Sequence, residues 1–168
     1  MRSAARRARP APAIDIRVES PLWRAVPGAA AVLRRAIGEA AQMAGAPAAA
    51  ELAIVLCDDA AMRKLNGRWR GRPEPTNVLS FPAAGRGTPG AGPLGDIAIA
   101  YETTAREAEA DGIGFADHLA HLAVHGFLHL LGYDHQSDDE ADAMERLERD
   151  ILERLDIADP YAAGDSAT

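Results

Sequence analysis

Four segments of the chain show the apolar patterns that are typical of β-strands. Residues 14–18 (Ile-Asp-Ile-Arg-Val) alternate apolar and polar side chains, which predicts a strand with one buried face. Residues 51–57 are almost continuously apolar, and this flatter pattern indicates a central strand. Two further runs predict strands over residues 76–81, stopped by Pro82, and over residues 94–100.

The segments between and after these strands carry the apolar spacing and the capping residues of helices. The expected helices cover about residues 28–44, 59–66, 103–110, 118–131 and 137–155. Asp58 and Asp117 are placed to cap the second and the fourth, and Ser137-x-x-Glu140 forms a capping box at the start of the last. The inward-facing stripe of the last helix is Ala141, Met144, Leu147, Ile151 and Leu155.

Strands followed by three consecutive helices, without internal repeats, predict an α+β fold. We expect a single domain over residues 14–158, a four-stranded mixed sheet packed with about five helices, in an order that the pattern leaves open. The arginine-rich residues 1–13 are expected to be a disordered tail, or the product of a start codon placed too early, rather than a transit peptide. Residues 159–168 are expected to be a disordered C-terminal tail. The glycine- and proline-rich residues 67–75 and 83–93 are expected to be loops, the second one mobile.

The composition sets limits on location and partners. The 168 residues contain no run of eighteen apolar ones, so no membrane-spanning helix is expected. The single cysteine, Cys57, allows no internal disulfide and fits a reducing cytoplasm, and its apolar neighbours indicate a small buried side chain. The net charge of −7 is uneven, because residues 134–159 hold eleven acids against three bases, whereas residues 61–90 hold six bases against one acid. Such a protein is no general nucleic-acid coat, and its basic segment is either a local phosphate-binding element or a solvated loop.

Three of the five histidines lie within eleven residues, in the segment His125-Gly-Phe-Leu-His129-Leu-Leu-Gly132-Tyr-Asp-His135. Residues four apart on a helix share one face, with Cβ atoms about 5–6 Å apart, so His125 and His129 can bind one ion. A continuing helix would carry His135 about 9 Å beyond His129 along the axis. Gly132 can adopt the left-handed conformation that ends a helix, and the chain can then turn back to add His135 to the same site.

Two other histidines share the stripe of the predicted helix. His118 and His121 precede His125 at steps of three and four, so His121 and His125 form a competing pair. His121 and His129 are about 12 Å apart along the axis, too far to share an ion, so the third ligand must come from outside the helix. We therefore expect one zinc ion on His125, His129 and His135. His121 is a candidate for contact with a ligand or with substrate, and His118 is expected to be a partly exposed polar residue.

The ligand set indicates a catalytic centre. Three neutral ligands leave a zinc ion with its full charge and an open fourth position, whereas structural sites are closed by four protein ligands. Asp134 adjoins His135, and it is a candidate to orient an imidazole or move a proton, or else it only caps the turn. The spacing matches the metzincin peptidase signature H-E-x-x-H-x-x-G-x-x-H except that Gly126 replaces the glutamate that activates water. The pattern favours metal-assisted hydrolysis and argues against proteolysis.

The histidine segment resembles the signature H-G-x-L-H-L-x-G-Y-D-H of the YbeY family, bacterial metal-dependent endoribonucleases of ribosomal RNA maturation. Other blocks similar to that family follow in the same order: Leu65-Asn66, Trp69-Arg70-Gly71, residues 75–82 (Pro-Thr-Asn-Val-Leu-Ser-Phe-Pro) and Leu94-Gly95-Asp96-Ile97. The resemblance extends from about Glu51 to the end of the last predicted helix. It implies zinc bound by His125, His129 and His135, and a functionally important arginine at Arg70.

The resemblance also implies a function. It points to a single-strand-specific endoribonuclease that matures the 3′ end of small-subunit ribosomal RNA and serves ribosome quality control, with ribosomal or assembly-factor proteins as candidate partners. Arg70 would hold the phosphodiester, and Trp69, in place of the more usual tyrosine, keeps an aromatic surface that can stack on a base. A 2′-hydroxyl nucleophile supplied by the RNA would remove the need for the missing glutamate. Two alternatives stay open, a metal-dependent peptidase and a ribosome-assembly module with a largely structural zinc.

Overall fold

A computed structural model describes residues 11–83 and 93–161 of the chain and contains a four-stranded mixed sheet. The strands are β1 (Ala13–Val18), β2 (Glu51–Cys57), β3 (Val78–Pro82) and β4 (Pro93–Ala100), in the order β1-β2-β4-β3. β1, β2 and β4 run parallel, and β3 pairs with β4 in the antiparallel sense. The predicted mixed sheet and the inner position of β2 are confirmed.

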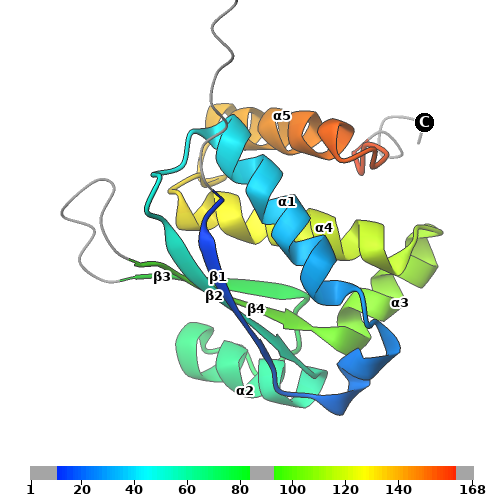
Figure 1. Ribbon diagram of the computed structural model, residues 1–168. Coiled ribbons are helices and arrows are strands. Elements are labelled where there is room, and N and C mark those ends of the chain that lie inside the picture. The colour runs from blue at the N-terminus through cyan, green and yellow to red at the C-terminus, as the bar shows by residue number, and fades with distance from the viewer. Residues whose placement is uncertain (1–10, 84–92, 162–168) are drawn as a thin grey trace, which may run out of the picture.

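Helices cover both faces of this sheet, which confirms the α+β class (Figure 1). They are η1 (Pro21–Ala25), α1 (Ala29–Ala44), α2 (Asp59–Arg70), α3 (Tyr101–Asp111), α4 (Phe115–Leu130) and α5 (Asp138–Arg154). α1 and α4 lie on one face, α5 packs on the outer side of those two helices, and α2 lies on the opposite face (Figure 1). This layering places the histidine-bearing helix α4 directly against β3 and β4.

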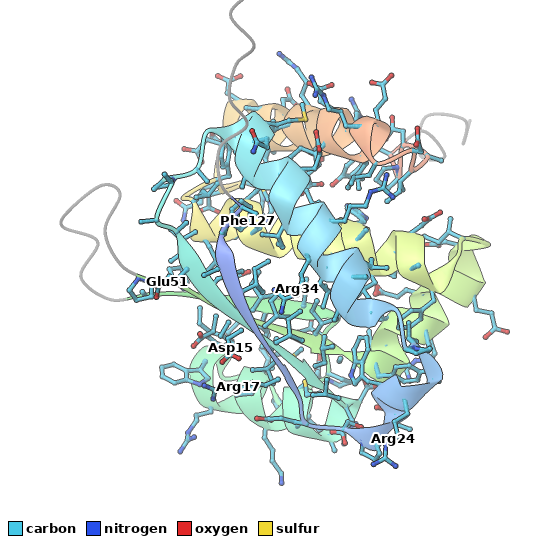
Figure 2. All side chains as sticks on the ribbon, in the orientation of Figure 1. Asp15, Arg17, Arg24, Arg34, Glu51 and Phe127 are labelled. Carbon is cyan, nitrogen blue, oxygen red and sulfur yellow. The ribbon has the colours of Figure 1, made fainter. Side chains whose placement is uncertain are left out.

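The hydrophobic core is divided by the sheet into two clusters. The larger one joins the sheet to α1, α4 and α5, and Phe127 of α4 is among its fully buried side chains (Figure 2). The smaller one lies between the sheet and α2 and consists of Cys57, Met62, Leu79, Ala98 and Ala100. Cys57 is fully buried, as predicted, and burial together with the charge of Asp58 raises the pKa of its thiol to about 12. Its thiol is therefore neutral and packs as a small apolar group.

The edge strand β1 carries charged side chains on its exposed face. Arg17 and Asp15 pair at 3.0 Å, and the Arg34 guanidinium of α1 donates to the Ile14 carbonyl at 3.2 Å (Figure 2). Charges on an edge strand discourage pairing with a second chain, so β1 ends the sheet on this side.

Helix α2 is longer than the sequence pattern predicts. We expected it to stop near residue 66, before a loop over residues 67–75, but it continues to Arg70. One glycine inside a helix costs only about 1 kcal/mol, and contacts in the turn offset this cost. The Asn66 side chain donates to the Glu74 carbonyl at 2.8 Å, and the Gly71 N–H donates to the Gly67 carbonyl at 3.2 Å. The extension makes Arg70 the last residue of a helix rather than part of a loop.

Two other predicted boundaries differ from those in the structure. Pro82 is the last residue of β3 rather than the residue after it, and β3 begins at Val78 rather than at residue 76. A proline is tolerated there because β3 is an edge strand, where the missing N–H leaves no neighbouring carbonyl unpaired. Asp117 lies in the first turn of α4, and Gly114 is the N-cap. An acidic side chain in the first turn still interacts favourably with the helix dipole. By contrast, Ser137 caps α5 as predicted, with its hydroxyl accepting from the Glu140 N–H.

The predicted loop and tails fall largely outside the described residues. Residues 84–92, most of the loop expected at 83–93, and residues 1–10 of the expected N-terminal tail are not described. Of the expected C-terminal tail, residues 159–161 are described, and they pack against α5. This packing brings the end of the described chain close to the histidine helix.

Candidate metal centre

The turn after α4 brings the third histidine back to the other two. Gly132 has a φ of 102°, in the region that favours glycine. Its N–H donates to the His129 carbonyl at 3.0 Å, and the Tyr133 N–H donates to the Leu128 carbonyl at 3.1 Å. These two bonds form the Schellman closure of a helix. The helix stop predicted at Gly132 is confirmed.

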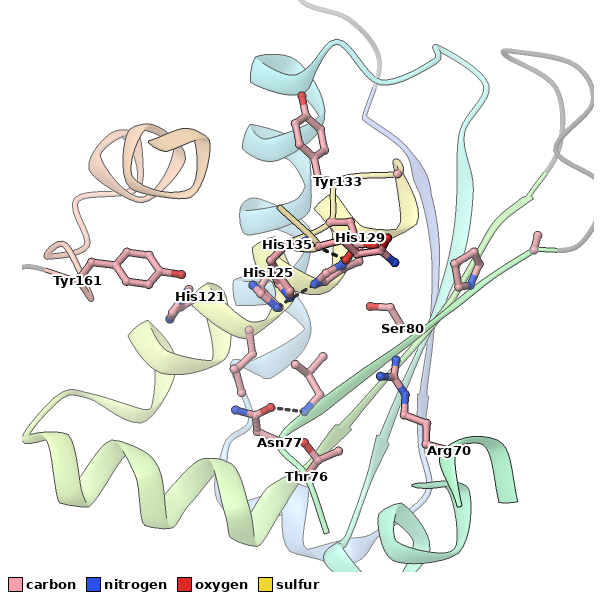
Figure 3. A pocket seen from close by; sticks show the side chains of 17 residues that line it. Arg70, Thr76, Asn77, Ser80, His121, His125, His129, Tyr133, His135 and Tyr161 are labelled. Atoms are coloured by element: carbon pink, nitrogen blue, oxygen red, sulfur yellow. Dashed lines mark hydrogen bonds between the residues drawn. The ribbon is translucent and has the colours of Figure 1, made fainter. Parts of the chain in front are cut away.

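The three histidines then lie around one point (Figure 3). His125, His129 and His135 each offer a nitrogen, and the three nitrogens lie within 4.8 Å of one another. The Nε2 atoms of His125 and His129 are 3.1 Å apart. A tetrahedral zinc ion with Zn–N bonds of about 2.1 Å separates its ligands by about 3.4 Å, so this arrangement fits one ion after a small adjustment. His121, which has the same spacing from His125, is not among these three candidate ligands.

The protonation state of His129 suits a ligand. Burial lowers the pKa of its imidazole, and the charges of His125 and His135 lower it further. The imidazole is therefore neutral near pH 7, and only neutral imidazole has a lone pair to offer a metal.

The histidines open into a cavity of about 1040 Å³. Its walls come from four places in the sequence, namely the end of α2, the approach to β3 with β3 itself, α4 with the following turn, and Tyr161 (Figure 3). The polar residues that line it include Arg70, Thr76, Asn77, Ser80, His121 and Asp134. A cation site beside an arginine in an open cavity is an arrangement that can bind a phosphodiester.

Arg70 lines the histidine cavity, whereas its neighbour Trp69 does not. Arg70 is exposed, and it lines the histidine cavity as well as two neighbouring grooves. Trp69 is 65% exposed, its ring lies 5.9 Å from that of Phe81, and it lines one of the grooves but not the histidine cavity. The fold therefore brings Arg70 to the histidines and leaves Trp69 in the adjoining groove.

Asp134 and His121, the other candidates, are both cavity residues. The Asp134 carboxylate accepts the His135 backbone N–H at 2.8 Å, the local contact of a turn. His121 lies one helical turn before His125, and its Nε2 is 3.4 Å from Glu148 Oε2. Its direct partner is thus a carboxylate that the sequence pattern did not single out.

Glu148 and Tyr161 are the site residues that sequence reasoning missed. Glu148 of α5 is fully buried, and its Oε1 lies 2.5 Å from His125 Nδ1, while the Tyr161 hydroxyl donates to Oε2. Burial alone would raise the pKa of this carboxyl, but hydrogen bonds from His121, His125 and Tyr161 outweigh it and lower the pKa to about 2. One signal was available, because residue 148 follows the inward-facing Met144 by one helical turn, where an acid is unusual.

Gly126 has a packing role. A Cβ atom at this position would lie 3.1 Å from Ser80 Oγ, 3.2 Å from Ile97 Cγ2 and 3.3 Å from Val78 Cγ2. The Ser80 hydroxyl also donates to the Gly126 carbonyl at 2.9 Å. α4 and the sheet are therefore in contact at this point. Any side chain at residue 126 would therefore require these neighbours to shift by a few tenths of an ångström.

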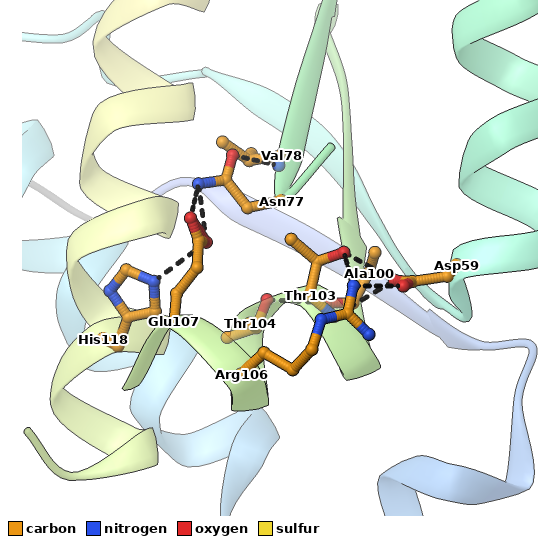
Figure 4. A network of polar contacts seen from close by, with 9 residues as sticks. All are labelled: Asp59, Asn77, Val78, Ala100, Thr103, Thr104, Arg106, Glu107 and His118. Carbon is orange, nitrogen blue, oxygen red and sulfur yellow. Dashed lines mark hydrogen bonds and ion pairs between the residues drawn. The ribbon is translucent and has the colours of Figure 1, made fainter. Parts of the chain in front are cut away.

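A second polar network holds the start of β3 beside the cavity (Figure 4). The Asn77 amide donates to Glu107 at 2.9 Å, and its oxygen accepts the Val78 N–H at 2.7 Å. Glu107 also lies 3.3 Å from Nε2 of His118. His118 is buried, so the expectation that it is partly exposed is wrong. The Glu107 carboxylate of α3 covers His118 and pairs with it.

Fold and site together define a class of protein, a single α+β domain with a candidate three-histidine metal centre. The family model described as Endoribonuclease YbeY matches residues 25–156. A Rhodopseudomonas palustris (strain BisA53) protein named Endoribonuclease YbeY is 55% identical over 161 residues, which cover 93% of this chain and 94% of the relative. A Nitrobacter hamburgensis protein of the same name is 55% identical over 157 residues, with 90% and 83% covered. This chain belongs to the YbeY endoribonuclease family.

The family resemblance inferred from the sequence motifs is thereby confirmed. Among solved structures, a Thermotoga maritima protein studied in solution is similar with a TM-score of 0.48 and 21% identity, covering 88% of this chain and 97% of that one. No helix in the described parts of the chain is long and apolar enough to cross a membrane.

Proposed function

We propose that this protein is a zinc-dependent, single-strand-specific endoribonuclease of the cytoplasm. Its substrate is ribosomal RNA, at the 3′ end of the small-subunit RNA and in ribosome quality control. Membership of the YbeY endoribonuclease family supports the reaction class. The observation that carries the proposal is that one cavity contains both Arg70 and the three clustered histidines.

The residues of the cavity have separate roles in binding a phosphodiester. His125, His129 and His135 would hold a zinc ion, which when bound would supply a Lewis acid to stabilise negative charge on a phosphoryl oxygen. Arg70 contributes a planar guanidinium that donates two parallel hydrogen bonds to phosphate oxygens and neutralises the charge that develops there. Its backbone lies at the end of α2, where the Asn66 side chain donates to the Glu74 carbonyl and holds the following turn.

The cavity favours a nucleophile that the substrate provides. Asp134 is the one carboxylate among the described residues that line it, and one of its oxygens is occupied by the His135 N–H. An RNA 2′-hydroxyl next to the scissile phosphate requires no separately positioned water. Its oxygen forms a bond to phosphorus, the bond to the 5′-oxygen breaks, and the 2′ proton is released as the 5′-oxygen gains one. The products are a 2′,3′-cyclic phosphate and a 5′-hydroxyl.

The packing at Gly126 argues against the peptidase alternative. The glutamate of the peptidase signature would stand at residue 126, where three side-chain atoms already lie within 3.3 Å of the point that a Cβ atom would occupy. Glu148, a nearby carboxylate besides Asp134, is fully buried on the Nδ1 side of His125. Neither position offers a base to a peptide in the cavity.

The proposal is tested by giving the zinc-loaded protein a single-stranded ribosomal RNA and an unfolded peptide. Arg70→Ala is expected to lower the rate of RNA cleavage about 10²- to 10³-fold, as expected for the loss of one charge-stabilising donor. His129→Ala is expected to abolish cleavage together with tight zinc binding. Arg68→Ala is the matched control, since Arg68 is also exposed on α2 but is absent from the cavity wall.

The other outcomes separate the alternatives. Peptide cleavage that is indifferent to Arg70→Ala supports a peptidase. No turnover on either substrate, with ribosome association intact, supports an assembly module with structural zinc. End analysis of cleaved RNA tests the nucleophile, because a 5′-phosphate with a 3′-hydroxyl would contradict attack by the 2′-hydroxyl.

A further inference from the structure

We propose that Glu148 is the positioning residue of the metal centre, which holds the His125 imidazole in the Nδ1–H form and so presents Nε2 to the ion. Tyr161, beyond the end of α5, holds Glu148 in place. The inference deepens the proposed function and rests on its metal site. It assigns a role to two residues outside the histidine signature.

The geometry at His125 selects one tautomer. A neutral imidazole carries its proton on one nitrogen and offers a lone pair on the other. Glu148 Oε1 lies 2.5 Å from Nδ1 and, as a carboxylate, can only accept, so the proton belongs on Nδ1. The lone pair is then on Nε2, the atom that lies 3.1 Å from Nε2 of His129. The carboxylate and the ligand cluster thus lie on opposite sides of one ring, as in carboxylate–histidine–zinc arrangements generally.

The burial of Glu148 is difficult to explain without the site. An ionised carboxylate removed from water is strongly unfavourable unless it is paired and hydrogen-bonded. Glu148 is 0% exposed, and its neighbours on the same face of α5, Met144, Ile151 and Leu152, are buried apolar residues. If residue 148 served packing alone, an apolar side chain would be expected there. Instead, the carboxylate contacts the side chains of His121, His125 and Tyr161, all of which line the cavity.

The C-terminal segment completes the arrangement. The Tyr161 hydroxyl donates to Glu148 Oε2, the oxygen that does not face His125. Arg149 holds this segment on α5, since its guanidinium lies 5.3 Å from the centre of the Tyr161 ring and its Nε is 3.4 Å from Asp159 Oδ2. Figure 3 shows Tyr161 directed from the segment after α5 toward the histidine side of the cavity. Tyr161 thereby restrains rotation of the carboxylate away from the ligand.

The experiment measures zinc affinity and the His125 tautomer in the full-length chain. Zinc affinity is obtained by competition with a chelator, and the tautomer from ¹⁵N shifts of labelled imidazoles in the metal-free protein. Glu148→Gln keeps the shape of the side chain and is expected to weaken zinc binding about 10- to 100-fold, as for other partners of ligand histidines. Because the glutamine amide can present its NH2 group to His125 as well as its oxygen, the fraction of His125 in the Nδ1–H form is also expected to fall. Tyr161→Phe is expected to produce a smaller loss in affinity, and it keeps the ring that packs under Arg149.

The matched control is Glu153→Gln, which removes one charge from an exposed position of the same helix. It is expected to change neither the zinc affinity nor the His125 tautomer. Equal zinc affinity in wild type, Glu148→Gln and Tyr161→Phe, with unchanged His125 signals, would overturn the assignment and leave Glu148 as a structural link between α4 and α5. If Glu148→Gln does not fold, Tyr161→Phe still tests the assignment, because residue 161 is only partly buried.

Failure of the proposed function is distinguishable from failure of this inference. Wild-type protein that binds no zinc would overturn both. Zinc affinity that depends on Glu148, in a protein that does not cleave RNA, would support the positioning role and overturn the endoribonuclease proposal.

Discussion

Replacing Gly126 by alanine tests the close packing of α4 against the sheet. A glycine-to-alanine change in a helix interior favours the helix by about 1 kcal/mol. At residue 126 the added Cβ would meet Ser80 Oγ at 3.1 Å, Ile97 Cγ2 at 3.2 Å and Val78 Cγ2 at 3.3 Å. Forcing such neighbours apart costs about 1–3 kcal/mol, and displacing Ser80 from the Gly126 carbonyl costs about another 1 kcal/mol. The net expectation is a destabilisation of about 1–3 kcal/mol.

Gly38→Ala is the matched control for this change. Gly38 also lies inside a helix, α1, but a Cβ atom there would have no heavy atom within 4 Å. The same gain in helix propensity should therefore appear unopposed, as a stabilisation of about 1 kcal/mol. In a domain of this size each kcal/mol shifts the melting temperature by about 2–4 °C. The two alanine variants should move in opposite directions.

The assay is thermal and urea unfolding of the metal-free protein, followed by zinc titration. Gly126→Ala should melt about 2–12 °C below wild type and Gly38→Ala about 2–4 °C above it. A Gly126→Ala variant as stable as Gly38→Ala would refute the packing argument, and with it the argument from packing against a glutamate at this position.

Three further predictions concern the core, the pH dependence and the metal. Trp23→Phe should destabilise the fold by about 1–3 kcal/mol in urea unfolding, because the Trp23 Nε1–H donates to the buried Cys57 carbonyl at 2.8 Å. Burial raises the pKa of Asp59, but hydrogen bonds from Arg106 and its neighbours outweigh this and lower it (Figure 4). Because the pKa of Asp59 is lowered in the folded state, its ionised carboxylate stabilises the fold above about pH 4, and this stabilisation is lost as the pH falls. The difference in unfolding free energy between wild type and Asp59→Asn should therefore narrow below that pH, and a constant difference would contradict this. Zinc at about a thousand times its dissociation constant should stabilise the protein by about 4 kcal/mol, and chelation or His129→Ala should remove the shift in melting temperature.

Much of the fold was predictable because it follows from local pattern. The alternation of β1, the apolar run of β2 and the Ser137 cap of α5 are all encoded within a few neighbouring residues. Boundaries failed where a distant contact outweighed a local preference. The extension of α2 past Gly67 accompanies the Asn66 contact to the Glu74 carbonyl, and the inclusion of Pro82 in β3 depends on that strand being at the sheet edge.

The candidate ligands were likewise determined by the sequence alone. A spacing of four on a helix places His125 and His129 together, and a glycine at residue 132 permits the turn that returns His135. These relations need only the geometry of one helix end, so the sequence predicts them without knowledge of the rest of the fold.

Only the tertiary structure decided what surrounds those ligands. Glu148 comes from the next helix, Tyr161 from the end of the described chain, and Ser80 from a strand that is packed against Gly126. Arg70 reaches the same cavity from the opposite face of the sheet. No local pattern carries these contacts, because they depend on how the layers of the domain pack together.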